Sequence, residues 1–414
     1  MFQYQAKTLY CENKPLADIA QSVGTPLYVY SKSELLRRAR AYRAYPGALV
    51  CYAVKANGNP ILLRLLGEEG LGADVTSGGE LFLALQAAIP AKRIIYSGVG
   101  KRRDEIEMAL AASIRALHVE SMMELDVIAA VAQDMGRVAH VGVRVNPDIP
   151  AQTHPYDSTG RLDHKFGVPR ESAVTLLHRA AEHPFLNPVG LAAHIGSQIT
   201  SLAPYRRLVA FLVELANDMA AAGIDLEYVD VGGGLGIDYG QNGTPPIEEW
   251  IETVSQPVEN AGYELVVEPG RSIVGPAGVL LTEVLYNKEQ GAKYFVIVDA
   301  GMNDLIRPAM YDANHPLWPV RQRFNTDAPI VPLNVVGPIC ETGDFLARER
   351  LLPQPQVGDL LALMQAGAYG FAMSSNYNGR LRLPEVLVDG DQCELIRHRQ
   401  NLEHLLDGVP ISGE

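Results

Sequence analysis

Short apolar runs alternate with longer stretches of helical periodicity from about residue 49 to residue 268. Each apolar run ends in a turn and is typical of a buried strand, and strands that alternate with helices predict a parallel sheet. The predicted strands cover residues 49–55, 72–76, 94–98, 116–120, 140–145, 190–195, 228–231 and 264–268. The predicted helices cover residues 60–69, 77–88, 101–112, 121–135, 170–182, 203–222 and 246–261. Eight strands in about 220 residues match the number and size of a TIM barrel of the (β/α)8 type, which we favour over a doubly wound sheet.

The pattern changes after Gly275, where strand-like runs follow one another with few helices between them. These runs cover residues 279–286, 294–299, 333–337, 360–367, 385–388 and 392–397. Glycine and proline punctuate them, which predicts a β-sandwich or an open β-barrel. We therefore predict a barrel domain over residues 26–275 and a β domain over residues 276–414. Residues 1–25 are expected to add a strand to the β domain.

The composition argues against several classes of protein. The chain has 414 residues, of which 47% are hydrophobic, and this is ample for a large core rather than a disordered chain. The net charge of −13, with no basic run, argues against nucleic acid and anionic membranes as partners. No secretory signal is expected, and no apolar stretch approaches the ~20 residues of a membrane span. The four cysteines lack the spacing of a zinc site, so we expect a reduced, cytoplasmic protein with no bound metal.

One lysine stands where the first predicted barrel strand meets its turn. The segment C-Y-A-V-K-A-N-G-N-P carries Lys55 from an apolar run into a turn rich in Asn, Gly and Pro. An ammonium at the mouth of a buried strand is partly withdrawn from water, and a neutral lysine amine can form a Schiff base with an aldehyde. The alternative is a lysine whose head group simply reaches the rim of the barrel. The other strand ends decide between these two interpretations.

Other polar residues, Arg144 among them, fall at the ends of later predicted strands, and the ends of parallel barrel strands share one rim. The glycine run 232–236 predicts a backbone cradle for an anion, with Arg271 beside it. Glu268 is placed to pair with a protonated ring nitrogen, and His194 to stack on a planar ring. The structural alternatives are a tight turn for the glycines, a salt bridge for Glu268 and a hydrogen-bonded core position for His194. Together these residues supply the parts that pyridoxal phosphate requires.

A series of motifs resembles those of the fold-type III pyridoxal-phosphate decarboxylases. In chain order they are Y-A-V-K-A-N, H-I-G-S-Q, G-G-G-L-G, E-P-G-R, C-E-T-G-D and G-A-Y-G-F-A-M-S-S-N-Y-N. The resemblance extends from about Thr25 to about Asp391. Within the family the chain is similar to the diaminopimelate decarboxylases. The resemblance implies an alanine-racemase-like barrel with a β domain, and pyridoxal 5′-phosphate as the cofactor.

The resemblance also implies roles for particular residues. Lys55 would be the Schiff-base lysine, and Cys340 the acid that returns a proton to the α-carbon. The other cofactor-binding positions would be His194, Ser197, Gly234, Glu268, Gly270, Arg271 and Tyr369. The substrate-binding positions would be Arg271, Arg307, Tyr311, Glu341 and Tyr369. In the family, the segment with Cys340 and Glu341 reaches into the active site of the partner, so a homodimer is implied.

The charges at these positions favour one substrate. Meso-2,6-diaminopimelate has an amino-acid group at each end, so its unreacted end presents a carboxylate and an ammonium. Arg307 and Glu341 supply a cation and an anion for those groups, whereas ornithine, lysine or arginine would require mainly acids. The expected reaction therefore yields L-lysine and CO2, the last step of lysine biosynthesis. The alternatives are a decarboxylase of ornithine, lysine, arginine or a carrier-bound amino acid, a racemase of the same fold type, and an inactive homologue that regulates a partner.

Overall fold

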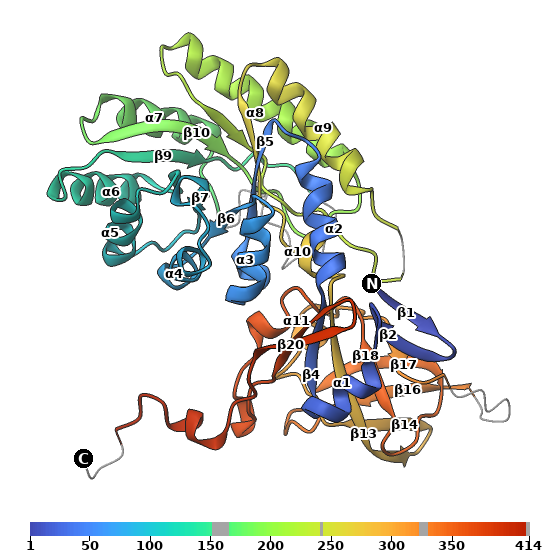
Figure 1. Cartoon of the computed structure of the whole chain (residues 1–414). Helices are drawn as coiled ribbons and strands as arrows, with labels where there is room; N and C mark the ends of the chain where they lie inside the picture. The colour runs from blue at the N-terminus through green and yellow to red at the C-terminus, as the bar shows by residue number, and fades with distance from the viewer. Residues whose placement is uncertain (151–164, 241–242, 323–329, 411–414) are drawn as a thin grey trace. The chain divides into compact units, whose positions relative to one another are not determined.

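The computed structural model describes residues 1–150, 165–240, 243–322 and 330–410 (Figure 1). Their contacts divide the chain into two compact units. One unit is Leu36–Ile273, and the other combines Met1–Leu35 with Val274–Glu414. The segment 153–167, which the polar sequence predicts to be a lid, lies largely outside the described residues. Among the described residues, no helix combines the length and apolar character needed to cross a membrane.

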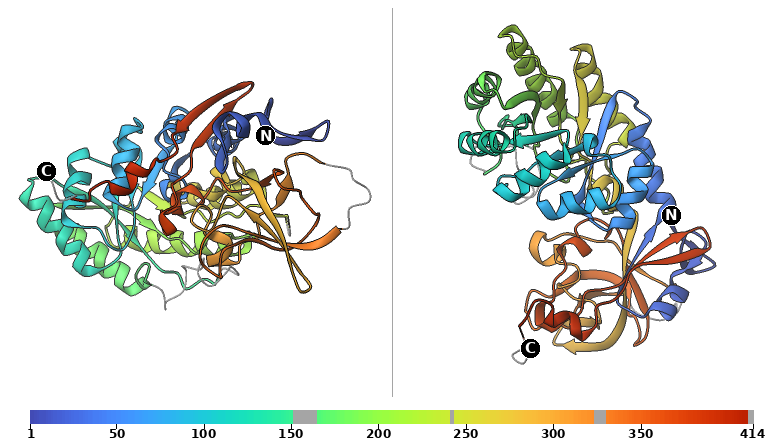
Figure 2. Two further views of the ribbon diagram at one scale, coloured as in Figure 1. Left: turned by 90° about the horizontal axis from the view of Figure 1, so that it is seen from below. Right: turned by 60° about the vertical axis from the view of Figure 1, so that its left-hand side comes forward.

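The unit Leu36–Ile273 is a closed barrel of parallel strands with helices on its outside (Figures 1 and 2). The strands are β5 (Ala48–Ala53), β6 (Gly72–Val75), β7 (Ile94–Tyr96), β8 (Ala116–Val119), β9 (Ala139–Arg144), β10 (Leu186–Ala192), β11 (Tyr228–Asp230) and β12 (Glu264–Val267). The helices are α2 (Lys32–Arg43), α3 (Pro60–Glu68), α4 (Gly78–Gln86), α5 (Arg103–Ala112), α6 (Met122–Asp134), α7 (Arg170–Glu182), α8 (Ala203–Ala221), α9 (Ile247–Asn260) and α10 (Arg271–Val274). The strands pair in chain order, and β12 pairs with β5 to close the ring. The predicted TIM barrel is confirmed.

The interior of the barrel is filled by side chains rather than open. Strand β5 is buried along its whole length, because helices cover its outer side and other strands supply the inner packing. Tyr228 on β11 is fully buried and contributes the largest side chain of an internal cluster that includes Leu49 and Val266. This ring fits only because β10 carries Gly190, where a Cβ atom would lie 2.4 Å from the Tyr228 ring. The packed interior leaves the strand ends as the place for chemistry.

Serine side chains begin two of the barrel helices. Ser77 Oγ accepts a hydrogen bond from the backbone N–H of Glu80 at 3.2 Å and caps α4. Ser121 Oγ caps α6 in the same way through Glu124, also at 3.2 Å. An N-cap serine satisfies a helix N–H group that would otherwise lack a partner. These caps therefore define where the loops after β6 and β8 end.

The second unit is built on a nine-stranded mixed sheet, so the predicted β domain is confirmed. Its strands are β4 (Leu27–Ser31), β13 (Gly278–Gln290), β14 (Lys293–Val298), β15 (Leu317–Pro319), β16 (Ile330–Val336), β17 (Phe345–Pro353), β18 (Leu360–Leu363), β19 (Glu385–Asp389) and β20 (Gln392–Arg397). Its one α-helix after the barrel is α11 (Arg307–Tyr311) in the described residues. The long strand β13 pairs with β4 and β18 near its start and with β14 near its end.

The N-terminal region contributes to this second unit in two ways. A small separate sheet is formed by β1 (Phe2–Gln5), β2 (Thr8–Cys11) and β3 (Lys14–Pro15), which precede α1 (Leu16–Val23). Side chains from β1, β2 and α1 share one hydrophobic core with β4, β13 and β19. Strand β4 itself lies between β13 and β19 in the large sheet, although its residues fall inside the range 26–275 that the sequence assigns to the barrel domain. The strand that joins the large sheet is thus β4 and not a part of residues 1–25.

Candidate active site

Lys55 lies just beyond the end of the first barrel strand. Strand β5 stops at Ala53, and Lys55 stands in a 3₁₀ turn, Val54–Ala56, where the sequence predicts the last strand residue. Its Nζ atom is 3.0 Å from Asp74 Oδ2, at the end of β6. Asp74 is fully buried, whereas 38% of the Lys55 side chain is exposed. The feature that distinguishes Lys55 is therefore its ion pair with a buried carboxylate, rather than burial of its own side chain.

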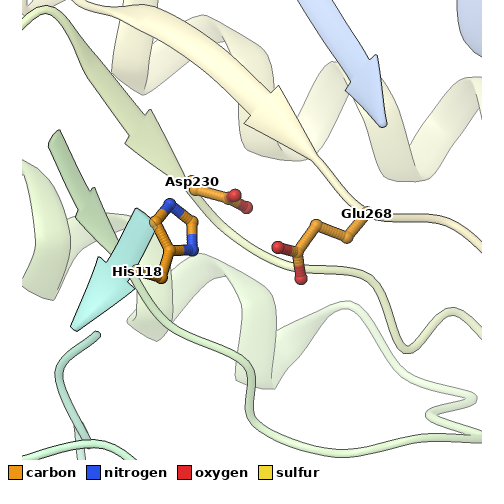
Figure 3. A group of neighbouring side chains, drawn as sticks. All are labelled: His118, Asp230 and Glu268. Carbon is orange, nitrogen blue, oxygen red and sulfur yellow. The ribbon is translucent and has the colours of Figure 1, made fainter. Parts of the chain in front are cut away.

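Two carboxyl groups and an imidazole meet next to this pair. His118 on β8, Asp230 on β11 and Glu268 directly after β12 come from three different strands (Figure 3). They are all buried, and their nearest ligand atoms lie within 4.8 Å of one another. Histidine and carboxylates so close together are also ligand types of metal sites, so the absence of a metal stays a prediction. Sequence reasoning singled out Glu268 but missed His118 and Asp230, which no short spacing connects to it.

Burial sets the charge of this cluster. It raises the pKa of Glu268 well above its usual range, and the neighbouring Asp230 and Asp74 raise it further, while Lys55 and Arg144 oppose the shift. Burial also raises the pKa of Asp230 to about 7, against the hydrogen bond from the Gly232 N–H. Desolvation favours the neutral form of a carboxyl, and like charges reinforce that preference. The cluster therefore retains a proton until a cation lies against it.

A line of hydrogen bonds extends from Glu268 into the barrel. Ser97 Oγ lies 3.4 Å from Glu268 Oε1 and 3.3 Å from His118 Nδ1. The other ring nitrogen, His118 Nε2, lies 2.9 Å from the hydroxyl oxygen of Tyr228. Burial, followed by Lys101 and Arg144, lowers the pKa of His118 to about 3, so the imidazole is neutral. The side chains linked to Glu268 in this line of hydrogen bonds are thus polar and uncharged.

Two loops at the strand ends are joined to each other by backbone bonds. Ile199 N–H donates to Gly234 C=O at 2.9 Å, and the Gln198 side chain bonds both the N–H and the C=O of Ile237. Gly234 has a φ of +91°, and a Cβ atom there would lie 2.1 Å from the Gly196 carbonyl oxygen. Only glycine tolerates both the positive φ and so close an approach. The H-I-G-S-Q and G-G-G-L-G motifs therefore form one structure.

His194 is held in one tautomer by this pair of loops. Its Nδ1 atom accepts a hydrogen bond from the Gly233 N–H at 3.2 Å. Burial lowers the pKa of His194 well below its usual value, and the positive charges of Lys55 and Arg144 lower it further. The ring is therefore neutral and carries its proton on Nε2. A neutral, oriented imidazole is suited to lie against a flat ring.

Arg271 follows β12 and lies against the same loops. Its Nη2 donates to Ser197 Oγ at 2.8 Å, and its Nη1 donates to the Tyr239 hydroxyl at 3.0 Å. Arg271 is only 5% exposed. A Cβ atom on the preceding Gly270 would lie 3.0 Å from the Ala56 side chain, so this peptide packs closely on the turn that holds Lys55. The structure thus joins a buried cation, a serine hydroxyl and glycine backbone, and it adds Tyr239, which the motifs did not indicate.

Arg144 supplies a second cation at this rim, with 11% of its side chain exposed. It ends β9, and its Nη1 pairs with Glu120 Oε1 at 3.0 Å. The other oxygen of Glu120 accepts a hydrogen bond from the Gly167 N–H at 2.8 Å. Arg144 is among the charges that lower the pKa of both Glu268 and His194. Sequence reasoning placed Arg144 at a strand end but assigned it no role.

The remaining predicted site residues belong to the second unit. Arg307 begins α11 and is 3% exposed, and its Nη1 lies 2.9 Å from His315 Nε2. Tyr311 ends the same helix. Tyr369 has a φ of +56°, an uncommon conformation for a bulky residue that is often found at functional sites. The next residue must be glycine, since a Cβ atom on Gly370 would lie 2.5 Å from a backbone carbonyl.

Cys340 and Glu341 are exposed but stand on a well-anchored loop. The Cys340 N–H donates to Asn378 Oδ1 at 2.7 Å. The buried carboxylate of Asp344 accepts hydrogen bonds from the N–H groups of Ile339, at 2.8 Å, and Met302, at 2.6 Å. The final aspartate of C-E-T-G-D thus fixes the loop, a role that the motif alone did not indicate. All four cysteines of the chain are free thiols.

Comparison with known proteins identifies close relatives. Residues 21–275 match the family model described as pyridoxal-dependent decarboxylase, pyridoxal binding domain. The chain is 47% identical over 407 residues to diaminopimelate decarboxylase of Aquifex aeolicus, covering 98% of this chain and 96% of that protein. It is 46% identical over 399 residues to the enzyme of the same name from Neisseria meningitidis serogroup B, covering 96% and 95%. The crystal structure of diaminopimelate decarboxylase from Helicobacter pylori complexed with L-lysine matches with a TM-score of 0.91 at 40% identity, covering 95% of this chain and 98% of that one.

Proposed function

Because the chain belongs to the pyridoxal-dependent decarboxylase family, and within it to the diaminopimelate decarboxylases, we propose that it converts meso-2,6-diaminopimelate to L-lysine and CO2. It is then the carboxy-lyase of the last step of lysine biosynthesis. The observation that carries this proposal is the assembly of Lys55, a neutral His194, a buried Glu268 and Arg271 where parallel barrel strands end. Each of these groups matches one part of pyridoxal phosphate.

The residues present fit this cofactor. Arg271, Ser197 and Gly270 surround a position where an anion would meet a buried guanidinium, a hydroxyl and close-packed backbone. The N–H groups of Gly232 and Gly233 already donate to Asp230 and His194, so the phosphate contacts are expected to begin at Gly234. Tyr369 of the second unit is proposed to complete the phosphate site.

Glu268 is proposed to hold the ring nitrogen in its protonated form. With its raised pKa, the Glu268 carboxyl carries a proton when no cation faces it. A cationic ring nitrogen beside it would favour the carboxylate form, so Glu268 would lose that proton. His194, neutral and oriented by Gly233, is proposed to stack on the ring. When bound, pyridoxal phosphate draws electrons from the α-carbon of the substrate, which permits the loss of CO2.

Lys55 is proposed to be the residue whose amine would hold the cofactor. Asp74, 3.0 Å from its Nζ atom, would pair with the Lys55 ammonium when the side chain is not attached to the cofactor. Cys340 is proposed to return a proton to the α-carbon after CO2 has left, since a thiol is a competent proton donor in a site that excludes water. Arg271, Tyr311 and Tyr369 are proposed to contact the substrate.

Charge complementarity supports the choice of substrate. Arg307 is proposed to bind the carboxylate at the unreacted end, and Glu341 the ammonium beside it. The exposure of Cys340 and Glu341 in a single chain supports their action in the site of a second copy, and we propose a homodimer. A cytoplasmic location is proposed on the sequence pattern. We propose a domain boundary near residue 35 rather than 26, since β4 pairs within the sheet of the second unit, and we keep the boundary near residue 275.

The proposal is tested by measuring CO2 release from meso-diaminopimelate beside ornithine, lysine and arginine. The expected result is rapid release from meso-diaminopimelate and little from the other three. Preferred release from ornithine, lysine or arginine would establish the alternative amino-acid decarboxylase. Exchange of the α-hydrogen with solvent without CO2 would indicate a racemase, and a purified protein that binds no pyridoxal phosphate would indicate an inactive homologue.

A further inference from the structure

His315 stands between Arg307 and a strand end of the second unit. It immediately precedes Pro316 and β15, and its Nδ1 atom lies 2.9 Å from the carbonyl oxygen of Met364, which follows β18. Strands β15 and β18 pair with each other, and the Met364 N–H donates to the Pro316 carbonyl at 2.8 Å to continue their ladder. The sheet therefore fixes both the imidazole and its backbone anchor.

Two contacts of the His315 ring nitrogens determine its protonation. A carbonyl oxygen can only accept a hydrogen bond, so the Met364 contact requires a proton on His315 Nδ1. A guanidinium can only donate, so the contact with Arg307 Nη1, at 2.9 Å, requires a lone pair on His315 Nε2. A doubly protonated ring cannot satisfy both. His315 is fully buried and is therefore held as the neutral Nδ1–H tautomer.

We propose that His315 is a positioning residue for substrate binding, which orients the Arg307 guanidinium toward the carboxylate at the unreacted end of the substrate. This rests on the role proposed above for Arg307. A neutral imidazole fixes the guanidinium without cancelling its charge, whereas a carboxylate at the same place would fix and neutralise it. A histidine at position 315 thus removes rotational freedom from a long side chain without adding a negative charge beside the guanidinium.

The test uses ligand binding to the holoenzyme without turnover. L-Lysine retains the carboxylate that Arg307 would bind, and cadaverine is the same molecule without it. We would measure the affinity of each ligand by calorimetry for the wild type, His315→Asn, His315→Gln, His315→Glu and the reference variant Arg307→Ala. Asparagine places its amide near Nδ1 and keeps the Met364 contact, while glutamine reaches the position of Nε2 and keeps an acceptor for Arg307.

We expect His315→Asn to weaken L-lysine binding roughly tenfold, because a hydrogen bond to a charged group is lost, and to leave cadaverine binding within about twofold. His315→Gln should retain affinity for L-lysine within about threefold of wild type. His315→Glu should bind L-lysine more weakly than His315→Gln, since the glutamate competes for the guanidinium. The KM for meso-diaminopimelate should follow these affinities more closely than kcat does.

Several results would overturn the inference. If His315→Asn binds L-lysine like the wild type while Arg307→Ala does not, His315 has no positioning role although Arg307 keeps its own. If Arg307→Ala also binds L-lysine normally, the proposed role of Arg307 fails instead. Equal losses for L-lysine and cadaverine, or a loss in His315→Gln as large as in His315→Asn, would indicate that His315 only stabilises the fold.

Discussion

Two sets of candidate site residues, one from each unit, are held in contrasting ways. In the barrel, Glu268 and Asp230 are buried, and burial shifts their pKa values upward. In the second unit, Cys340 and Glu341 are exposed on a loop whose backbone is anchored by Asp344. Groups that must carry a proton in a defined state need a low-dielectric setting that the barrel already supplies. Groups on an exposed loop are positioned by their own unit but acquire such a setting only when something covers them.

Replacement of Lys55 by alanine tests the barrel side of this contrast most severely. The variant should lose roughly 10⁴-fold or more of its activity, because the group proposed to hold the cofactor and to be exchanged for substrate is gone. The visible absorbance of covalently bound pyridoxal phosphate should disappear with it. Asp74→Asn is the matched control, since it removes the ion pair with Lys55 and leaves the amine. Full activity in Lys55→Ala would refute the assignment of the barrel site.

The variant Glu268→Gln tests whether Glu268, whose pKa is raised, acts through the charge of its carboxylate. Glutamine keeps the size and hydrogen bonding of the side chain but cannot pair with a protonated ring nitrogen as an anion does. We expect kcat to fall about 10²-fold while the protein still binds the cofactor, in line with the usual contribution of a positioned acid or base. Steady-state kinetics and the absorbance of the purified protein provide the two measurements. Unchanged kcat would mean that Glu268 has a structural role only.

The exposed loop is tested by a pair of cysteine variants. Cys340 and Cys393 are both exposed free thiols, but only Cys340 is proposed to donate a proton. Cys340→Ser should lower kcat about tenfold or more, because a hydroxyl is a far weaker acid than a thiol, and Cys393→Ser should leave it unchanged. Equal behaviour of the two variants would contradict the proposed role of Cys340. An activity of Cys340→Ser that recovers when mixed with Lys55→Ala protein would further support sites shared between two copies.

Many site residues of the barrel unit could be predicted from the sequence, for a physical reason. Buried parallel strands are continuous apolar runs, so their ends are visible in the sequence, and Lys55, Arg144 and Glu268 were located by those ends. His118 lies within β8 and Asp230 is the last residue of β11, and neither is singled out by the sequence because only the folded barrel places them beside Glu268. Residues brought together in this way are far apart in the sequence, so no short motif identifies them.

The second unit was harder to predict, because its strands are partly exposed. Strand β17, F-L-A-R-E-R-L-L-P, mixes charges into an edge strand that pairs with β16 alone in the described sheet, and it was missed. The short β15 was missed as well, and with it the ladder that fixes His315. Arg307, at the start of α11, and Cys340, on a loop, are named through a family resemblance, and no periodicity would have found them.

Two buried aspartates, one in each unit, allow the units to be compared through the pH dependence of stability. Burial raises the pKa of Asp230, in the barrel, and of Asp304, in the second unit, to about 7 in each case. Because a raised pKa favours the protonated folded state, each group stabilises the protein at low pH. This contribution is lost as the pH rises from about 4 through about 7, by at most roughly 4 kcal/mol per group.

The cofactor should separate these two contributions. In cofactor-free protein, the melting temperature should fall by several degrees between pH 5 and pH 8, and either Asp230→Asn or Asp304→Asn should reduce that fall. In holoenzyme, the cation proposed to lie against Glu268 changes the charges around Asp230, so the cofactor should alter the effect of Asp230→Asn and leave that of Asp304→Asn unchanged. Thermal unfolding of both forms across this pH range measures the difference. If cofactor changes the pH dependence of Asp304→Asn and not that of Asp230→Asn, the cationic group does not lie at the buried carboxyls of the barrel, and the proposed orientation of the ring is wrong.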